Sequence, residues 1–289
     1  MKILNRILIY LGEPEDFINI NMRVIVCGGR DFEDVEFVIH YLNHVHNWNP
    51  ITCVIAGAAR GVDTFAELWA DEMGIPKEVY PADWDKHGKS AGPIRNQEML
   101  DKSNPDMIMA FPGGRGTAHM FKIAEAHGGV DLWQSKQILF RKRDPKYGFM
   151  SNFAEGFEFV DQDGLIWSTS EHHYQAQKAT NEEDRSRVQM ARTAFDSKQI
   201  GGSITLRPDW DEVKIDCMRQ TLALKFAEGS KAADRLMDTQ AAYLVEDTPW
   251  GDQFWGKTYG VGESHLGKLL MERRESLILG TPVRIWYPE

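Results

Sequence analysis

Short apolar runs that end at glycine are the feature of this sequence that most restricts its fold. Three such runs occur in the first half, at residues 24–27, 51–56 and 107–111, and one or more glycines follow each of them. Runs of this length with little polar alternation are typical of strands buried on both faces. They therefore indicate a parallel sheet that helices cover on both sides.

Helical segments separate these runs. The pattern predicts strands at residues 24–27, 51–56, 78–80 and 107–111, and helices at 35–46, 61–73, 116–127 and from residue 93 onward. This alternation is typical of an α/β Rossmann-like domain, whose ligands bind beyond the carboxyl ends of the strands. We place that domain at residues 22–136. Residues 1–21 are then an N-terminal extension, whose deletion should leave folding intact.

The second half, residues 137–289, has a different pattern. A strand is expected at residues 138–140, and aromatic residues gather in the loops between longer helices. These helices are predicted at residues 170–180, 184–195, 211–227, 231–239 and 265–280. We therefore expect a second, mainly α (α+β) domain, and a length of 289 residues fits two domains.

Composition excludes several classes of protein. The net charge of −10 disfavours non-specific coating of a phosphate backbone, and no stretch reaches the roughly 18–20 apolar residues of a membrane span. The cysteines Cys27, Cys53 and Cys217 lack the spacing of a metal site, and the adjacent His172 and His173 point about 100° apart on a helix. We expect a cytoplasmic protein with buried thiols and packing or hydrogen-bonding histidines, without metal, cofactor or membrane partner.

Four loops combine glycine with an arginine, at residues 27–32, 56–63, 91–99 and 111–117. Glycine lets a backbone approach a ligand closely, helix N-termini bind phosphate, and the arginine fork matches phosphate oxygens. Tight turns with surface arginines are the alternative, which four successive loops disfavour. The expected nucleotide-binding residues are Gly28, Gly29, Arg30, Asp31, Gly57, Arg60, Asp63, Arg95, Asn96, Gly113, Gly114, Gly116 and Thr117.

The loop motifs resemble a known group of domains. GGRDF, GVD, PADW, AGPIRN and FPGGRGT are similar to the SLOG superfamily, in its small GGRDF branch, over about residues 22–135. The resemblance implies a Rossmannoid domain for nucleotide ligands, with association into homo-oligomers through this domain as an expectation. Related hydrolases use PGGxGTxxE with the glutamate as acid/base, but Met120 stands at that position and Glu125 is a weak substitute. We therefore expect nucleotide binding rather than hydrolysis here.

The predicted helix at residues 170–180 carries a carboxyl and an amine. Seven residues at about 100° each return to within roughly 20° of the start, so Glu171 and Lys178 share one face. Their long side chains can then converge on one bound group. A solvated Glu/Lys face is the alternative, but Tyr174 and Gln175 lie on the same face and favour a site.

An aromatic loop follows later, at residues 250–267. It contains two Trp, one Tyr and five Gly, and such a loop is costly to order unless its rings pack against something. Aromatic platforms that stack on a base would explain it. The alternative is a loop that caps the protein's own core.

The motifs of the second half strongly resemble the NADAR family over about residues 137–289. They are, in order, F-x-SNF, W-x-TSEHHYQAQKA, DW-x3-K-x3-M-x6-KF, LVE, FWG and G-x3-LG-x2-LM-x-RR. Members of this family are N-glycosidases. One group cleaves ribosylated pyrimidine intermediates of riboflavin synthesis, and another removes ADP-ribose from guanine bases.

The resemblance implies a role for each matching position. Glu171 would be a catalytic acid/base, Lys178 a nucleophile that forms a Schiff base with the opened ribose C1, and Asp252 a further catalytic residue lining the pocket. Ser264 stands where the family has Asn, which weakens the inference of a particular substrate. The implied substrate-binding residues are Ser151, Asn152, Phe153, Tyr174, Gln175, Trp210, Glu246, Trp255 and Gly256.

These residue types suit cleavage of a C1′–N bond. A carboxyl group protonates the leaving base or activates water, and a lysine with a lowered pKa captures C1 as an imine. Burial among aromatic rings lowers the pKa of Lys178 while Glu171 opposes that shift, and the sequence leaves the balance open. We expect an N-glycosidase for an ADP-ribosyl or ribosyl-phosphate compound, with an N-terminal domain that binds a related nucleotide.

Two alternatives stay open. In the first, the whole chain is a non-catalytic sponge or sensor of an NAD-derived nucleotide signal that is used in conflicts between bacteria and phages. In the second, the chain is an enzyme that acts on ADP-ribosylated nucleic acid. In the second case Arg141, Lys142, Arg143 and Lys146 would hold the phosphate backbone. An ordinary solvated linker cluster is the simpler interpretation of these four side chains.

Overall fold

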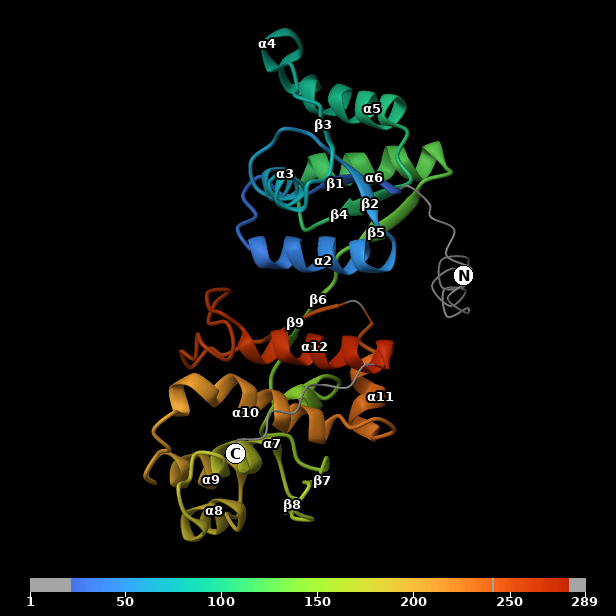
Figure 1. The fold of residues 1–289 in the computed structure, drawn as a ribbon. Helices are drawn as coiled ribbons and strands as arrows, with labels where there is room; N and C mark the ends of the chain where they lie inside the picture. The colour runs from blue at the N-terminus through green and yellow to red at the C-terminus, as the bar shows by residue number, and fades with distance from the viewer. Residues whose placement is uncertain (1–21, 241, 281–289) are drawn as a thin grey trace. The chain divides into compact units, whose positions relative to one another are not determined.

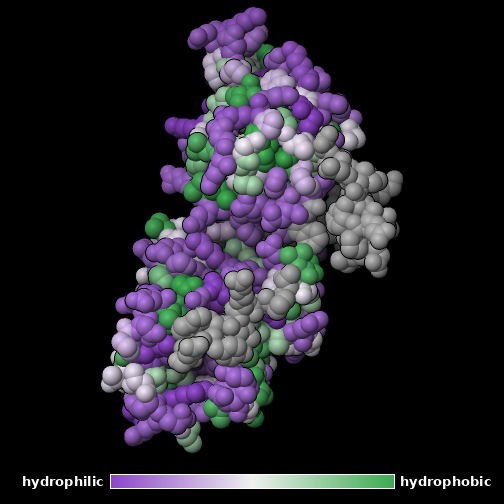
Figure 2. Space-filling model, viewed as in Figure 1, coloured by the Kyte–Doolittle hydropathy of each residue, from purple (hydrophilic) through white to green (hydrophobic). Residues whose placement is uncertain are grey.

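The computed structural model describes residues 22–240 and 242–280. The chain divides into two compact units, Met1–Ser135 and Lys136–Glu289 (Figure 1). The expected extension at residues 1–21 lies outside the described residues. The face drawn in Figure 2 is mainly hydrophilic with small hydrophobic patches. In the described part of the chain no helix is long and apolar enough to cross a membrane.

A five-stranded parallel sheet forms the centre of the first unit, in the order β3-β2-β1-β4-β5. Its middle is fully apolar: Ile25 pairs with Ile55 on one side and with Ile108 on the other, and all three are completely buried. The α/β Rossmann-like prediction is confirmed. The strands are β1 (Met22–Cys27), β2 (Ile51–Ala56), β3 (Lys77–Val79), β4 (Met107–Ala110) and β5 (Asp131–Gln134).

Helices cover both faces of this sheet (Figure 1). Met99 of α5 and Met120 of α6 pack with Ile25 on one side, whereas α2 and α3 contact each other on the other side. The helices are α2 (Val35–Trp48), α3 (Val62–Met73), α4 (Trp84–His87), α5 (Ala91–Ser103) and α6 (Arg115–His127), with the 3-10 turn η2 (Gly88–Ser90) before α5.

Strand β5 is the element of this sheet that the sequence pattern missed. It has polar residues, Asp131 and Gln134, at its two ends, and none of its four residues is fully buried. It pairs only with β4 at the edge of the sheet, so it lacks the continuous apolar run that marks a central strand.

The second unit is mainly helical with short strands. Helix α10 packs against α7 and α12, and β6 pairs in parallel with β9, although the two strands are about a hundred residues apart in sequence. The helices are α7 (Ser170–Ala176), α8 (Glu182–Gln189), α9 (Ala194–Gly201), α10 (Trp210–Lys225), α11 (Lys231–Met237) and α12 (His265–Leu279), with the 3-10 turn η3 (Gly148–Met150). The strands are β6 (Gln137–Phe140), β7 (Phe159–Val160), β8 (Ile166–Trp167) and β9 (Tyr243–Glu246).

One predicted helix is wrong, because residues 184–195 do not form a continuous helix. Two short helices, α8 and α9, occupy this region and are separated by residues 190–193. The Asn181 side chain accepts a hydrogen bond from Asp184 N, and the Thr193 side chain accepts one from Asp196 N. Each of these side chains caps a new helix N-terminus, so the chain starts a second helix instead of extending the first.

Glycines let the loops at the carboxyl ends of the strands pack closely. Gly29 N donates to Pro112 O at 2.9 Å, and Val62 N donates to Gly29 O at 3.3 Å, so three loops are tied together by backbone hydrogen bonds. Gly61 has a φ of +76°, and a Cβ there would lie 2.3 Å from Gly29 O. This position therefore excludes any side chain.

A pair of glycine substitutions tests this packing. Gly61→Ala should lower the free energy of unfolding of the first unit by about 2–4 kcal/mol, because the added Cβ meets backbone atoms at a glycine-only conformation. Gly114→Ala is the matched control, because both glycines are helix N-caps but a Cβ at Gly114 would meet nothing within 4 Å, so this change should cost about 1 kcal/mol or less. Calorimetry of the full chain measures both, and equal losses would contradict the loop-packing explanation.

Candidate active site

Helix α7 carries the predicted acid, and all seven of its residues are buried. It begins where expected, since the Thr169 side chain caps it by accepting from His172 N. Glu171 is only 4% exposed, and Gln175 Nε2 donates to its Oε1 at 2.7 Å. Burial raises the pKa of Glu171, while this hydrogen bond and the charges of Lys198 and Lys178 act in the opposite direction. Glu171 therefore keeps its proton to a higher pH than an exposed glutamate does.

Lys178 is close to this acid, but not by the predicted route. The helix ends at Ala176 rather than continuing to residue 180, so Lys178 lies in the following turn and not on the helix face. Its carbonyl accepts from Arg207 N at 2.9 Å, and Ala179 pairs with Leu206, which draws the chain away from the helix axis. These tertiary contacts replace the helical hydrogen bonds.

The Lys178 amine faces aromatic rings. Its Nζ lies 5.4 Å from the Trp210 ring centroid and 5.9 Å from that of Tyr174. Tyr174 in turn packs against Trp210 at 5.1 Å and, edge-on, against Trp255 at 5.4 Å. Burial lowers the pKa of Lys178, with Glu171 opposing and Lys198 reinforcing the shift, so desolvation prevails over the neighbouring carboxyl.

A second buried carboxyl ends strand β9. Burial raises the pKa of Glu246 to about 8, and the charges of Asp252 and Glu171 add to the shift. Asp252 itself is half-buried, and its Oδ1 accepts from Phe254 N and Trp255 N, which orders the start of the aromatic loop. The charge of Asp252 thus raises the pKa of both Glu171 and Glu246, and Glu171 raises the pKa of Glu246 as well.

The Ser151–Asn152 segment joins these groups. Ser151 Oγ donates to Glu246 Oε1 at 3.4 Å, and Asn152 O accepts from Glu171 N at 3.0 Å. Asn152 Oδ1 is buried without a hydrogen-bond partner, and so is Gln175 Oε1. Buried acceptors without a partner are rare in folded proteins, so these two atoms mark the region as unusual.

Backbone packing explains the position of Gly256. A Cβ at this residue would lie 2.5 Å from Glu246 O, so the aromatic loop lies directly against the end of β9. Phe153, another predicted substrate-binding residue, is half-buried, and Lys198 Nζ lies 5.7 Å from the centroid of the Phe153 ring. The predicted residues of the second unit thus come from five separate segments of the chain.

Two amines of this region were not predicted as site residues. Lys225 is 3% exposed, donates to Ser151 O at 3.0 Å, and has its pKa lowered to about 7 by burial. The KF motif includes it, but a lysine near a helix end gives no sign of burial. Lys198 is exposed on α9 and belongs to no motif, so no sequence signal marks it.

The adjacent histidines have structural roles, as expected. His172 Nδ1 contacts Thr169 Oγ1 at 2.8 Å and its Nε2 contacts Ala191 O at 3.1 Å. His173 Nδ1 contacts Thr221 Oγ1 at 2.7 Å, and burial lowers the pKa of His173 to about 4. Both imidazoles are therefore hydrogen-bonded packing groups.

Some aromatic residues of the loop at residues 250–267 pack inward and others are exposed, so the loop fits both interpretations, a platform for a ligand and a cap on the protein's own core. Trp255 packs into the site, whereas Trp250 and Tyr259 are 63% and 85% exposed. Ser264, at the start of α12, has a φ of +54°, a left-handed conformation that Asn adopts more readily than Ser. Ser264 is therefore less suited to the left-handed backbone of this turn than the Asn that the family resemblance leads one to expect here.

In the first unit, several predicted ligand residues make internal contacts instead. Arg95 Nη1 donates to Gly57 O and lies 3.9 Å from Asp63 Oδ2. Asp63 accepts from Gly57 N and Ala59 N, and burial raises its pKa to about 6. Arg95 and Asp63 thus support the strand-end loops from within.

Most of the remaining predicted residues of this unit lie nearer the surface, although Asn96 is buried. Arg60 and Asp31 are exposed and form an ion pair of 2.7 Å, while Asn96 Nδ2 donates to Gly116 O at 3.0 Å. Nothing would meet a Cβ at Gly114 or Gly116, so the N-terminus of α6 is open. Gly28 and Gly29 lie beside this helix end, since a Cβ at Gly113 would lie 2.9 Å from Gly28 C and from Gly29 N.

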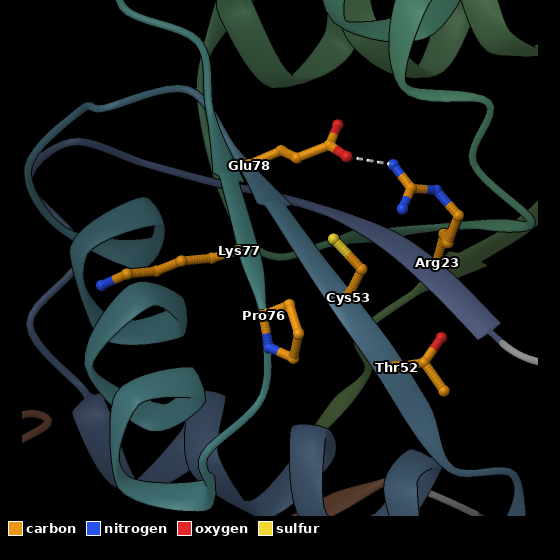
Figure 3. Close-up of a pocket in the computed structure, with 6 residues that line it drawn as sticks. All are labelled: Arg23, Thr52, Cys53, Pro76, Lys77 and Glu78. Atoms are coloured by element: carbon orange, nitrogen blue, oxygen red, sulfur yellow. Dashed lines mark hydrogen bonds and ion pairs between the residues drawn. The ribbon is translucent and has the colours of Figure 1, made fainter.

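An open cavity of about 500 Å³ lies elsewhere in this unit (Figure 3). Arg23, Thr52 and Lys77 line it, and each lies at or near the beginning of its strand, at the opposite end of the sheet from the glycine loops. Arg23 Nη2 pairs with Glu78 Oε1 at 2.5 Å across it. The ion pair joins two lining residues of the cavity, and none of the predicted nucleotide-binding residues is among the residues that line it.

Comparison with known proteins identifies both units. The NADAR domain matches residues 139–278, and the YspA, cpYpsA-related SLOG family matches residues 22–87. N-glycosidase YbiA of Escherichia coli is 37% identical over 151 residues, which cover 51% of this chain and 92% of YbiA. An N-glycosidase of Nostoc punctiforme is 37% identical over 147 residues, covering 48% of this chain and 92% of the relative.

The NMR structure of Escherichia coli YbiA is also similar, with a TM-score of 0.47 over 51% of this chain and 88% of that chain. The second unit is thus of the class of N-glycosidases, hydrolases that act on N-glycosyl bonds. The chain belongs to the NADAR family and carries a SLOG-family domain in its first unit. Both resemblances seen in the sequence are confirmed.

The buried Glu246 predicts an unusual pH dependence of stability. Its pKa is about 8 in the folded state against an ordinary 4.5, so the unfolded chain releases this proton first and stability falls between pH 4.5 and 8. Glu246→Gln removes that loss. Relative to the wild type, the variant should gain roughly 1–3 kcal/mol between pH 5 and pH 8 in urea unfolding. Glu158→Gln, at an exposed position, should show no such gain, and a constant difference for Glu246→Gln would refute the assignment.

Proposed function

We propose that the second unit hydrolyses the N-glycosidic bond of an ADP-ribosyl or ribosyl-phosphate compound, while the first unit binds a related nucleotide. The observation that carries the proposal is the position of the Lys178 amine, against the Trp210 and Tyr174 rings and within the field of the buried Glu171 carboxyl. An amine and a protonated acid on one substrate atom are what cleavage through an imine requires.

Lys178 is the proposed nucleophile. Its lowered pKa leaves a larger neutral fraction than an exposed lysine has, and only the neutral amine attacks carbon. The rings of Trp210 and Tyr174 exclude water from the amine and provide flat surfaces beside the sugar. Lys178 therefore supplies the electron pair for the new bond to C1′.

Glu171 is the proposed acid. Its raised pKa favours the protonated form of a carboxyl that Gln175 orients, and in the proposed step this proton goes to the leaving base nitrogen. As Lys178 Nζ bonds to C1′, the C1′–N bond breaks and its electrons take that proton. The C1′–O4′ bond then opens to the imine, O4′ takes up a proton, and one water molecule releases the sugar from the lysine. The net reaction consumes one water molecule. In this scheme the charge of Asp252 helps to raise the pKa of Glu171 and of Glu246.

A phosphorylated ribose compound is favoured by the pairing of two domains that recognise related ligands. The SLOG family match supports a nucleotide-type ligand in the first unit, and the open N-terminus of α6 gives phosphate oxygens backbone donors. Met120 is completely buried in the core, so its position supplies no acid/base to that unit. We therefore assign binding to the first unit and bond cleavage to the second.

Substitution of the two central residues tests the catalytic assignment. Lys178→Ala and Glu171→Gln should each lower the rate of base release by about 10²–10⁴-fold, because each removes one chemical step. The measurement is mass spectrometry of products from a panel of N-ribosides, including ADP-ribosylated guanosine. Borohydride reduction should also trap the sugar on Lys178 of the wild type.

Lys231→Ala, at an exposed lysine on α11, is the control and should retain full activity. Full turnover by both active-site variants would contradict the mechanism. If the wild type returns every compound unchanged after binding it, the chain is the sponge rather than the hydrolase.

The nucleotide site of the first unit has its own test. Arg115→Gln removes an exposed charge at the first residue of α6, and should weaken ADP-ribose binding to that unit about tenfold. Calorimetric titration of the Lys178→Ala protein measures this without turnover. Arg187→Gln, on α8 of the second unit, is the control, and equal binding by the Arg115 and Arg187 variants would place the ligand elsewhere.

A further inference from the structure

Lys198 is a charged side chain that no part of the proposed mechanism uses. It lies on α9, three residues before Gly201. A Cβ at Gly201 would lie 2.2 Å from Gln175 Oε1, so this part of α9 is in direct contact with the side chain that orients Glu171. Residues three apart share a side of a helix, which places Lys198 on the side of α9 that faces α7.

Two kinds of contact link Lys198 to the site. Its Nζ lies 5.7 Å from the centroid of the half-buried Phe153 ring, next to Asn152 in the Ser151–Asn152 segment. Its charge also reaches three groups of the site, since it lowers the pKa of Glu171, Lys178 and Glu246. The ring contact and these charge effects together place Lys198 beside the site.

Lys198 is nevertheless exposed and has no acidic partner. Among the described residues no carboxylate lies within 4.0 Å of its Nζ. Other cations of this unit are engaged: Lys142 pairs with Glu155, and Lys214 pairs with Asp211. An unpaired ammonium beside buried carboxyls is free to bind an anion.

A phosphate needs a cation that the catalytic groups do not supply. The raised pKa values of Glu171 and Glu246 favour their neutral forms, which offer no positive charge, and the half-buried Lys178 is committed to carbon chemistry. Gln175 Oε1 and Asn152 Oδ1, the unpartnered buried acceptors, suit sugar hydroxyls rather than phosphate oxygens. The sugar and its phosphate therefore need different partners.

We propose that Lys198 binds the phosphate group of the ribosyl substrate, and that it thereby selects phosphorylated over free ribosides. This assignment rests on the proposed function of the second unit. The same ammonium would accept the 5′-phosphate of a ribose phosphate or the pyrophosphate of ADP-ribose. Lys178 and Glu171 act at C1′, while Lys198 holds the far end of the sugar.

Equilibrium binding tests the proposal without turnover. Ribose, ribose 5-phosphate and ADP-ribose are titrated calorimetrically into wild type, Lys198→Gln, Lys198→Arg and Lys231→Gln. Lys198→Gln should weaken the binding of ribose 5-phosphate or of ADP-ribose about tenfold and leave the binding of ribose unchanged. Lys198→Arg should restore most of the affinity because it keeps the charge, and Lys231→Gln should match the wild type.

The arms separate the two phosphate sources. A loss for ribose 5-phosphate assigns Lys198 to a terminal phosphate, and a loss for ADP-ribose alone assigns it to the pyrophosphate. Unchanged binding of both phosphates in Lys198→Gln, an equal loss for ribose, or no phosphate binding by the wild type overturns the proposal. Absence of N-riboside cleavage with a normal Lys198 effect would instead reject the proposed reaction alone.

Discussion

Removal of charged groups from water is the constraint on which the second unit depends. Helix α7 is buried along its whole length, so it carries Glu171 into a medium that disfavours the ionised form. Gln175 and the nearby lysines recover part of that cost. The same desolvation lowers the pKa of Lys178, and acid and amine become reactive together for one physical reason.

The first unit depends instead on the tight packing of backbone in its strand-end loops. Gly61 and Gly29 allow three loops to hydrogen-bond to one another, and Gly57 makes room for the Arg95 side chain. A sequence motif of glycines and arginines therefore has two functions at once. Some of its members build the loops from within, and the open end of α6 is the place that we propose for the ligand.

The sequence predicted those parts of the protein that depend on local patterns. Continuous apolar runs marked β1, β2 and β4, and Thr169 marked the start of α7. The end of that helix depends on the pairing of Ala179 with Leu206, which no local pattern encodes. The break before α9 had a signal in Thr193 and Asp196, a helix-capping pair that periodicity alone overlooks. Lys198 had none, because its importance comes only from what folds against it.

The buried Lys225 has a consequence for the protein as a whole. Its pKa of about 7, against an ordinary 10.5, means that the unfolded chain holds a proton there that the folded chain lacks at alkaline pH, so this lysine adds stability as the pH rises above 7. Glu246 removes stability up to about pH 8. The contributions of this interior acid and this interior base to stability are therefore both least favourable at pH 7–8, close to neutrality.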